Sequence, residues 1–497
     1  MTPDAHNGRL PAAFAEEGLT RRQFVQAALG LGVSVSGAAA LLAGCSRTAG
    51  HGAKPAQLHG TVQVFSGFAA NVGTQAAVQQ ALAEAFILIH PKVGIDFLSA
   101  TSPAAARSQL SASIASRSVP DLVLPVGLAE VSRLVDRRAW LDLGPLLARD
   151  GLSLARFVPA SVPGARLISF FGTKSSAVVG LPVGIHDHAL ACNADLFAKA
   201  RVPLPPSGWS DPSWALNGSF VDTATAVTLD SSGRHPNDGA FNPSRITQFG
   251  IGRFPPEYAF YDFGGHFYDP SARRATLAEP GAVAGLQFAA DLVNKYHVQP
   301  SATQLAVLGA AGGGKGDPVL AAWHSGKLAM LDVCSCEVKS VLGATTFSWQ
   351  AAPLPVGPAR RFGFGELDLG AIPAAGANRD LAWEVLKFFA VQPANERRLA
   401  YDGLVSMPAL KDNQDAFVEG LKLDAPKIDP TLWTTGLASS STENDEWCPA
   451  FADVHDLATA TFARIVAGEL NPTQAMPQLQ AQSQAKIDAW FKTNKLP

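Results

Sequence analysis

Hydrophobic residues after residue 60 switch repeatedly between two spacings. Residues 62–64 alternate as in a β-strand, and apolar residues of 77–89 recur at the spacing of a helix face. The alternation returns at 93–97, a second helical face follows at 106–114, and a short apolar run occupies 122–124. The pattern predicts the element order β-α-β-α-β.

Strands joined by helices in this way are expected to form a parallel sheet with right-handed crossovers. In open α/β sheets, ligands lie beyond the carboxyl ends of the strands. We therefore expect ligand loops at residues 65–68 and 125–127.

A second group of elements follows. A turn-rich stretch at 180–184 gives way to another alternating segment and then to the sequence of residues 193–197. Residues 230–242 are Ser, Gly, Pro, Asn and Asp for the most part, which predicts a surface loop. Pro280 opens a predicted helix, since proline is tolerated in a first turn, and helical periodicity dominates from Leu381 to the C-terminus.

Length and charge narrow the classes of protein. A chain of 497 residues exceeds what one hydrophobic core usually supports, which predicts two lobes. The formal net charge is −3 and no basic run occurs, so we expect no nucleic-acid partner. With 45 Gly and 35 Pro, the composition is typical of an ordered chain with many tight turns.

The N-terminal segment has the order of parts of an export signal. Arg21 and Arg22 precede an uncharged span from residue 23 to 46, which contains Leu42-Ala43-Gly44-Cys45. This order resembles a bacterial twin-arginine lipoprotein signal, with cleavage before a lipidated Cys45. The alternative is a transmembrane helix over residues 25–42, which is barely long enough and contains several polar residues and glycines.

The signal interpretation predicts a signal peptide over 1–45 and a flexible tether over 46–58. Two or three acyl chains on Cys45 would anchor the protein stably. We expect it at the outer face of the cytoplasmic membrane or in the periplasm.

Four further cysteines are Cys192, Cys334, Cys336 and Cys448. One disulfide would suit an oxidising exterior, but its pairing cannot be read from sequence. Cys334 and Cys336 stand too close for an ordinary bridge, and buried, small apolar side chains are an equal alternative.

Four groups of motifs follow one another along the chain. They are Gly180-Leu181-Pro182 with Asn193-Ala194-Asp195-Leu196-Phe197; Gly264-Gly265-His266-Phe267-Tyr268-Asp269 with Pro280; Trp323 to Met330; and Pro353 to Pro358 with Gly370-Ala371-Ile372-Pro373. Their order resembles that of the bacterial extracellular solute-binding proteins of sugar ABC importers, the maltose-binding-protein-like group. Cys192 stands where that family usually has a tyrosine.

The resemblance implies an α/β fold of two lobes, the type II periplasmic-binding-protein fold, with a ligand cleft between lobes that several crossover segments join. By analogy, the first lobe comprises 59–180 and 320–355, and the second comprises 185–315 and 370–497. It implies a protein that is not an enzyme and needs no cofactor or metal. Its expected partners are a carbohydrate or polyol-like solute and the permease subunits of an ABC importer, and it is expected to act as a monomer.

A sugar site needs planar aromatic surface and side chains that both donate and accept hydrogen bonds. Residues of these types beside the expected crossovers are candidates for ligand contact, with glycines where backbone must approach closely. The candidates are Phe65, Ser66, Gly67, Phe68, Asp121, His186, Asp187, Phe263, Gly265, Glu366, Asp368, Trp433 and Trp447. His188 shares a strand face with His186.

Two other classes of function remain open at this point. His186-Asp187-His188 and Cys334-Ser335-Cys336 carry ligand types that suit zinc or copper, so a metal-binding or redox lipoprotein is one alternative, although no spacing matches a closed site. The other is a secreted carbohydrate-active hydrolase with Glu366 and Asp368 as its two carboxylates.

Overall fold

The computed structural model describes residues 57–494, with gaps at 70–73, 136–137, 167–176, 312–316, 339–340, 342–344, 425–430, 439 and 442–444. The expected signal peptide with Arg21, Arg22 and Cys45, and residues 46–56 of the expected tether, lie outside the described residues. Among the residues described, no helix combines the length and hydropathy needed to cross a membrane.

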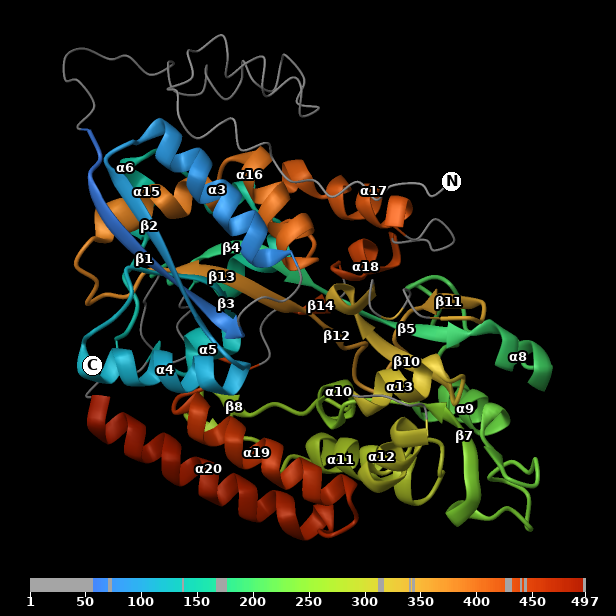
Figure 1. The fold of residues 1–497 in the computed structure, drawn as a ribbon. Helices are drawn as coiled ribbons and strands as arrows, with labels where there is room; N and C mark the ends of the chain where they lie inside the picture. The colour runs from blue at the N-terminus through green and yellow to red at the C-terminus, as the bar shows by residue number, and fades with distance from the viewer. Residues whose placement is uncertain are drawn as a thin grey trace, which may run out of the picture. The chain divides into compact units, whose positions relative to one another are not determined.

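Two five-stranded sheets form the centres of the two lobes (Figure 1). The first lobe has the strand order β2 (Val93–Ala100), β1 (Gly60–Ala69), β3 (Leu122–Gly127), β13 (Glu366–Ala371) and β4 (Leu181–His186). The second has the order β11 (Trp349–Ala352), β5 (His188–Asn193), β10 (Leu328–Cys334), β7 (Ile246–Ile251) and β6 (Leu229–Asp230). Two small sheets pair β12 (Gly363–Phe364) with β14 (Ser440–Ser441) and β8 (Tyr268–Asp269) with β9 (Arg274–Ala275).

The predicted β-α-β-α-β order is confirmed in the first lobe. β1 pairs in parallel with both β2 and β3, and helices α3 (Gln75–Ile89) and α4 (Pro103–Ser116) form the connections. Helix α4 begins where its sequence provides both start signals, since the Ser102 side chain accepts a hydrogen bond from Ala105 N and Pro103 occupies the first turn.

Further helices complete the first lobe. They are α5 (Leu128–Ser132), α6 (Gly144–Arg149), α7 (Val162–Ala165), α15 (Arg379–Ala390), α16 (Pro393–Arg397) and α17 (Asp415–Asp424). Helix α15 contacts β1, β3 and β4, so its strongly amphipathic sequence buries one face on this sheet.

The second lobe contains the remaining helices. They are α8 (Ala194–Ala200), α9 (Val221–Val227), α10 (Pro256–Asp262), α11 (Pro280–Asn294), α12 (Ala302–Ala311), α13 (Pro318–His324), α18 (Thr431–Gly436), α19 (Phe451–Val466) and α20 (Pro472–Asn494). α19 and α20 lie side by side and contact α11 (Figure 1). The helix predicted from Pro280 is confirmed as α11.

Two expected lobe assignments differ from the sheets. Residues 320–355 were expected in the first lobe, but β10 and β11 pair with β5 in the second. Residues 370–497 were expected in the second lobe. Helices α18, α19 and α20 do lie there, whereas the end of β13 and helix α15 belong to the sheet of the first lobe. The chain stays in the second lobe from β5 to β11 and re-enters the first lobe only at β13. The analogy had placed this return before β10.

Candidate functional site

The start of strand β13 lies at the carboxyl ends of β3 and β4. β13 is antiparallel to both neighbours, with Glu366 opposite His186 and Asp368 opposite Gly127. Because β1 is parallel to β3, its last residues reach the same edge of the sheet. This edge therefore gathers polar residues from segments that are distant in sequence.

Three consecutive residues carry the chain from one sheet to the other. His186 ends β4 in the first lobe, His188 begins β5 in the second, and Asp187 lies between them. All three are buried, with Asp187 fully inaccessible to solvent. We call residues 186–188 the crossing. Because buried ionisable residues need partners, the crossing requires compensating groups.

His186 is compensated by a carboxylate of the first lobe and also faces a hydroxyl of the second. Its Nε2 lies 2.9 Å from Asp368 Oδ2, and its Nδ1 lies 3.5 Å from Ser335 Oγ. Burial lowers the pKa of His186, but the Asp368 carboxylate outweighs burial, so the pKa is raised.

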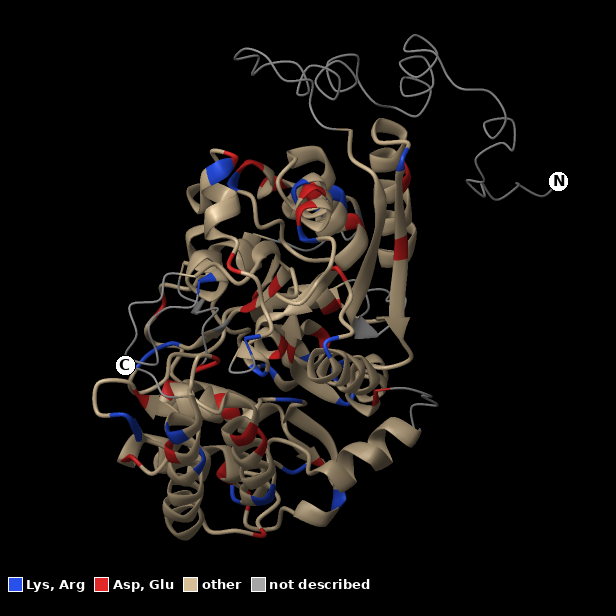
Figure 2. Cartoon of the chain, turned by 90° about the vertical axis from the view of Figure 1, so that its left-hand side faces the viewer, with Lys and Arg blue, Asp and Glu red and all other residues tan. Residues whose placement is uncertain are grey.

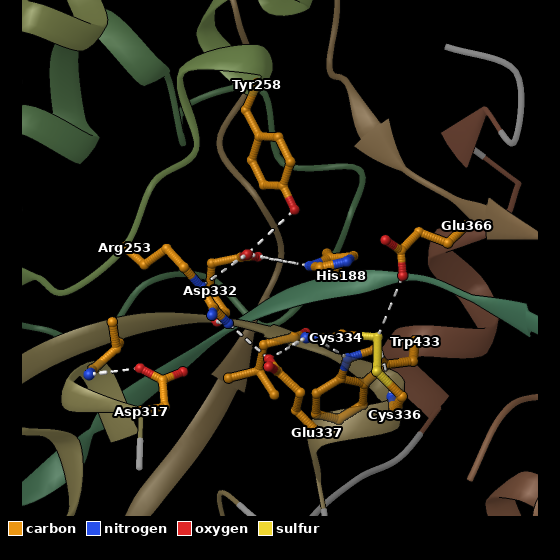
Figure 3. A network of polar contacts seen from close by, with 12 residues as sticks. His188, Arg253, Tyr258, Asp317, Asp332, Cys334, Cys336, Glu337, Glu366 and Trp433 are labelled. Carbon is orange, nitrogen blue, oxygen red and sulfur yellow. Dashed lines mark hydrogen bonds and ion pairs between the residues drawn. A yellow bond between two sulfur atoms is a disulfide. The ribbon is translucent and has the colours of Figure 1, made fainter. Parts of the chain in front are cut away.

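His188 is compensated from within the second lobe (Figure 3). Its Nδ1 lies 3.1 Å from Oδ1 of Asp332, a carboxylate of β10 that also accepts a hydrogen bond from the Tyr258 hydroxyl. Burial lowers the pKa of His188, but Asp332 outweighs it and raises the pKa to about 9. Arg253 donates to the Asp332 carbonyl at 3.0 Å and to Glu337 at 2.7 Å.

A disulfide lies beside these pairs, at the end of β10. Cys334 and Cys336 are bonded, which corrects the expectation that they stand too close for an ordinary bridge. The reason is the 3₁₀ turn Ser335–Glu337, which holds their Cα atoms 5.2 Å apart, within the usual range. Cys334 Sγ also lies 4.0 Å from Glu366 Oε2, so a residue of the second lobe faces one of the first (Figure 3).

The sequence of the chain matches a known protein family. The family model described as bacterial extracellular solute-binding protein matches residues 69–396, which is more than half of the chain. The chain is a bacterial extracellular solute-binding protein. No curated protein matches its sequence significantly.

Solved structures of two-lobe binding proteins resemble this solute-binding protein in fold. UspC of M. tuberculosis is 20% identical, with a TM-score of 0.62 over 86% of this chain and 100% of that one. Lmo0181 of Listeria monocytogenes, solved with cycloalternan, is 14% identical, with a TM-score of 0.66 over 88% and 99%. MalE3 of T. maritima, solved with maltose, is 16% identical, with a TM-score of 0.63 over 86% and 99%. The expected two-lobe α/β fold is thus confirmed.

The solute-binding protein has acidic and basic residues interspersed over both lobes (Figure 2). The charged side chains at the crossing therefore form local histidine–carboxylate pairs and are not part of a large surface of a single charge. The structure brings together four of the sequence candidates there, namely His186, Asp187, Glu366 and Asp368.

The candidates of β1 have separate surroundings. Ser66 is buried and accepts a hydrogen bond from the Gln75 amide at 3.2 Å. Gly67 is approached by β3, since an added Cβ would lie 2.9 Å from the Pro125 carbonyl oxygen. Phe65 lines a hollow of about 570 Å³ between β1, β2 and α4. Phe68 belongs to β1, but its side chain lies outside the described residues.

Asp121 lies at the opposite edge of the first sheet. It precedes β3, and its carboxylate accepts hydrogen bonds from Gln63 N at 3.0 Å and from Asn378 N at 3.1 Å. These contacts tie β1 to the segment before α15, and they give Asp121 a structural role away from the crossing.

Phe263 and Gly265 lie in the turn after α10. The Phe263 ring packs 5.5 Å from the Phe288 ring of α11, and Gly265 N donates to the Phe260 carbonyl at 2.8 Å. An added Cβ at Gly265 would lie 2.6 Å from that carbonyl oxygen, so the turn requires glycine for close packing.

The two candidate tryptophans are buried. Trp433 of α18 is fully buried beneath the end of β10 and donates to the Val333 carbonyl at 3.3 Å (Figure 3). Trp447 is 1% exposed, and its indole nitrogen has no hydrogen-bond partner among the described residues.

Sequence reasoning missed several groups at the crossing. Asp332 was not a candidate, although one carboxylate within the apolar run of β10 signals a buried partner. Trp209 was also missed. It is half-buried, and its ring lies 5.7 Å from the Arg361 guanidinium. A Cβ added to Gly436 would overlap both the Trp209 ring and Asp187 Oδ2, so these two side chains both lie against Gly436.

Proposed function

We propose that this protein captures a carbohydrate or polyol-like solute between its two lobes and passes it to the permease of an ABC importer. The observation that carries the proposal is the crossing itself. Polar groups of both lobes meet there, with the His186–Asp368 and His188–Asp332 pairs beside the exposed Glu366.

The chemistry of this edge suits a sugar. Carboxylates and imidazoles can accept or donate to hydroxyl groups, and the Trp209 ring offers a planar surface beside Asp187. Similar structures support the solute class, since those proteins were solved with cycloalternan, maltose and mannotriose bound.

Binding would act through closure of the lobes. A solute that contacts both lobes favours the closed state by its difference in affinity between states. We propose Ser66, Gly67, His186, Asp187, Glu366 and Asp368 as contacts from this edge, with no bond made or broken in the solute. The permease would recognise the closed state of a monomer.

A thermal-shift panel tests this function. Maltose, mannotriose, cycloalternan, a polyol and glycerophosphocholine are offered separately to the purified protein. A solute at 100 times its dissociation constant is expected to stabilise the folded state by about 2.7 kcal/mol. Chromatography of the incubated sugars is expected to recover them unchanged.

A pair of variants locates the site. Glu366→Gln is expected to reduce the shift, while Glu84→Gln, an exposed carboxylate on α3, should leave it unchanged. The proposal fails if no carbohydrate or polyol shifts the melt, or if a sugar is turned over.

We also propose the export route. Arg21 and Arg22 would direct twin-arginine export, residues 1–45 would end at a lipidated Cys45, and residues 46–58 would tether the lobes to the outer face of the membrane. Mass spectrometry of the membrane fraction should find an acylated N-terminal Cys45. Cys45→Ala should abolish that peptide, and replacement of both arginines by lysine should block export.

A further inference from the structure

Two sulfur atoms, two imidazoles and a carboxylate gather around Cys334. His186, Cys334 and Cys336 have ligand atoms within 4.8 Å of one another, and so do His188, Cys334 and Glu366. Four of these five residues are mostly shielded from solvent, while Glu366 is exposed. The set comes from β4, β5, the end of β10 and the start of β13, which explains why sequence spacing did not reveal it.

We propose that the reduced thiols of Cys334 and Cys336 form, with His186, a binding site for Zn²⁺. Thiolate sulfur and imidazole nitrogen are the donors that structural zinc prefers, in a tetrahedral set of four. Glu366 Oε2 lies 4.0 Å from Cys334 Sγ and belongs to the other group, with His188, so a movement of its exposed side chain would bring it to the fourth position.

The surroundings of His186 suit a metal ligand. Its Nε2 contacts the Asp368 carboxylate, while Nδ1 faces Ser335, the residue between the two cysteines. A carboxylate on the far nitrogen orients the ring and increases its basicity, and metal-binding histidines commonly have such a carboxylate, a backbone carbonyl or a water in that position. Asp368 is therefore a positioning residue in this site.

Reduction controls the site. The Cys334–Cys336 disulfide provides no thiolate, so Zn²⁺ lacks two donors in the oxidised protein. A phosphine reductant breaks the S–S bond by donating its electron pair. Water gives its oxygen to form the phosphine oxide and its two protons to form two thiols. Zn²⁺ then displaces the thiol protons to solvent as the Zn–S bonds form.

The proposal does not depend on the solute, because the metal is measured without any sugar present. The full chain carrying Cys45→Ser is reduced with a phosphine under anaerobic conditions, and Zn²⁺ is titrated against a chromophoric chelator. The expected result is one Zn²⁺ per chain after reduction and none before it.

Matched variants identify the ligands. Cys334→Ser with Cys336→Ser should abolish uptake, whereas Cys192→Ala with Cys448→Ala, the two buried free cysteines, should retain it. Asp368→Asn should weaken zinc affinity by about 10- to 100-fold. Co²⁺ in place of Zn²⁺ should give the thiolate-to-cobalt charge-transfer absorption.

A second measurement uses the unaltered cysteines of the lobes and so avoids any folding defect of the variants. Zn²⁺ should slow alkylation of Cys334 and Cys336 in the reduced protein and leave the rates at Cys192 and Cys448 unchanged. The proposal is overturned if the reduced protein takes up no zinc, if the double serine variant binds as much, or if alkylation of the pair is not slowed.

Discussion

The imidazole of His186 and the carboxylate of Asp368, 182 residues apart, meet at 2.9 Å between neighbouring strands of the first lobe. Both side chains are less than 10% exposed. The pair joins β4 to β13 at the end of β4, where the chain passes to the second lobe. It therefore stabilises the first lobe and also holds the crossing in place.

Asp368→Asn should therefore destabilise the protein strongly. Removing one partner of a buried pair leaves an uncompensated charge, which costs about 3–5 kcal/mol. Urea unfolding at neutral pH measures the change. Glu469→Gln is the control, since it breaks an exposed pair with Arg464 and should cost at most about 1 kcal/mol. Similar losses in the two variants would contradict this view of the pair.

Gly265→Ala tests the turn after α10. The added methyl group would press on the Phe260 carbonyl oxygen and ring, and such overpacking costs about 1–3 kcal/mol. Gly239→Ala is the matched control, because nothing lies within 4 Å of its added Cβ. Thermal unfolding of both variants measures the difference, and equal melting temperatures would show that the turn can relax without cost.

Local patterns predicted the elements better than their assembly. The alternation at Val62 and Val64 and the periodicity of 77–89 were enough for β1 and α3, because each pattern is set by neighbours in sequence. The lobe of β10 or β13 depends on pairing with strands far away in the chain, which local periodicity does not encode.

In the candidate site too, local sequence patterns were informative and long-range contacts were missed. His186, Asp187, Glu366 and Asp368 were predicted because side chains that donate and accept hydrogen bonds lie beside the expected crossovers. Tyr258 and Arg253 lay outside the prediction, since their contacts with Asp332 span 74 and 79 residues. Asp121 was a candidate just before its strand, where a structural role was an equal alternative, and its hydrogen bonds from Gln63 N and Asn378 N are structural contacts.

Glu396 gives a pH dependence to stability. Its carboxyl group is buried and accepts hydrogen bonds from Leu410 N at 3.0 Å and the Asn413 amide at 2.6 Å. Burial raises the pKa of Glu396 from 4.5 to about 7. Between these values the unfolded chain ionises while the folded protein stays protonated, so stability should fall as pH rises from 4.5 to about 7.

The full loss attributable to Glu396 is about 3 kcal/mol, from 1.36 kcal/mol per pKa unit. Urea unfolding across this range should show a shallower pH dependence for Glu396→Gln than for the wild-type protein. Glu419→Gln, at an exposed carboxylate paired with Arg397, should keep the wild-type dependence. Parallel curves for the wild-type protein and Glu396→Gln would refute the assignment to this group.

Trp209 should contribute a stacking surface to solute binding. Its indole N–H donates to the Leu432 carbonyl at 2.7 Å, which fixes the ring beside Asp187 while leaving the residue half-buried. Trp209→Ala should reduce sugar affinity by at least about tenfold, equivalent to 1.4 kcal/mol, whereas Trp209→Phe should retain most of it because a ring remains.

Trp349 provides the matched control for this effect. It is also half-buried, but it lies on β11 at the edge of the second sheet. Isothermal titration with the sugar that gives the largest thermal shift compares Trp209→Ala with Trp349→Ala. If Trp349→Ala loses as much affinity, or Trp209→Ala loses none, stacking on Trp209 is wrong. A loss of sugar affinity in Trp209→Ala but not in Trp349→Ala would place the solute beside the crossing, where His186 and Asp368 are paired.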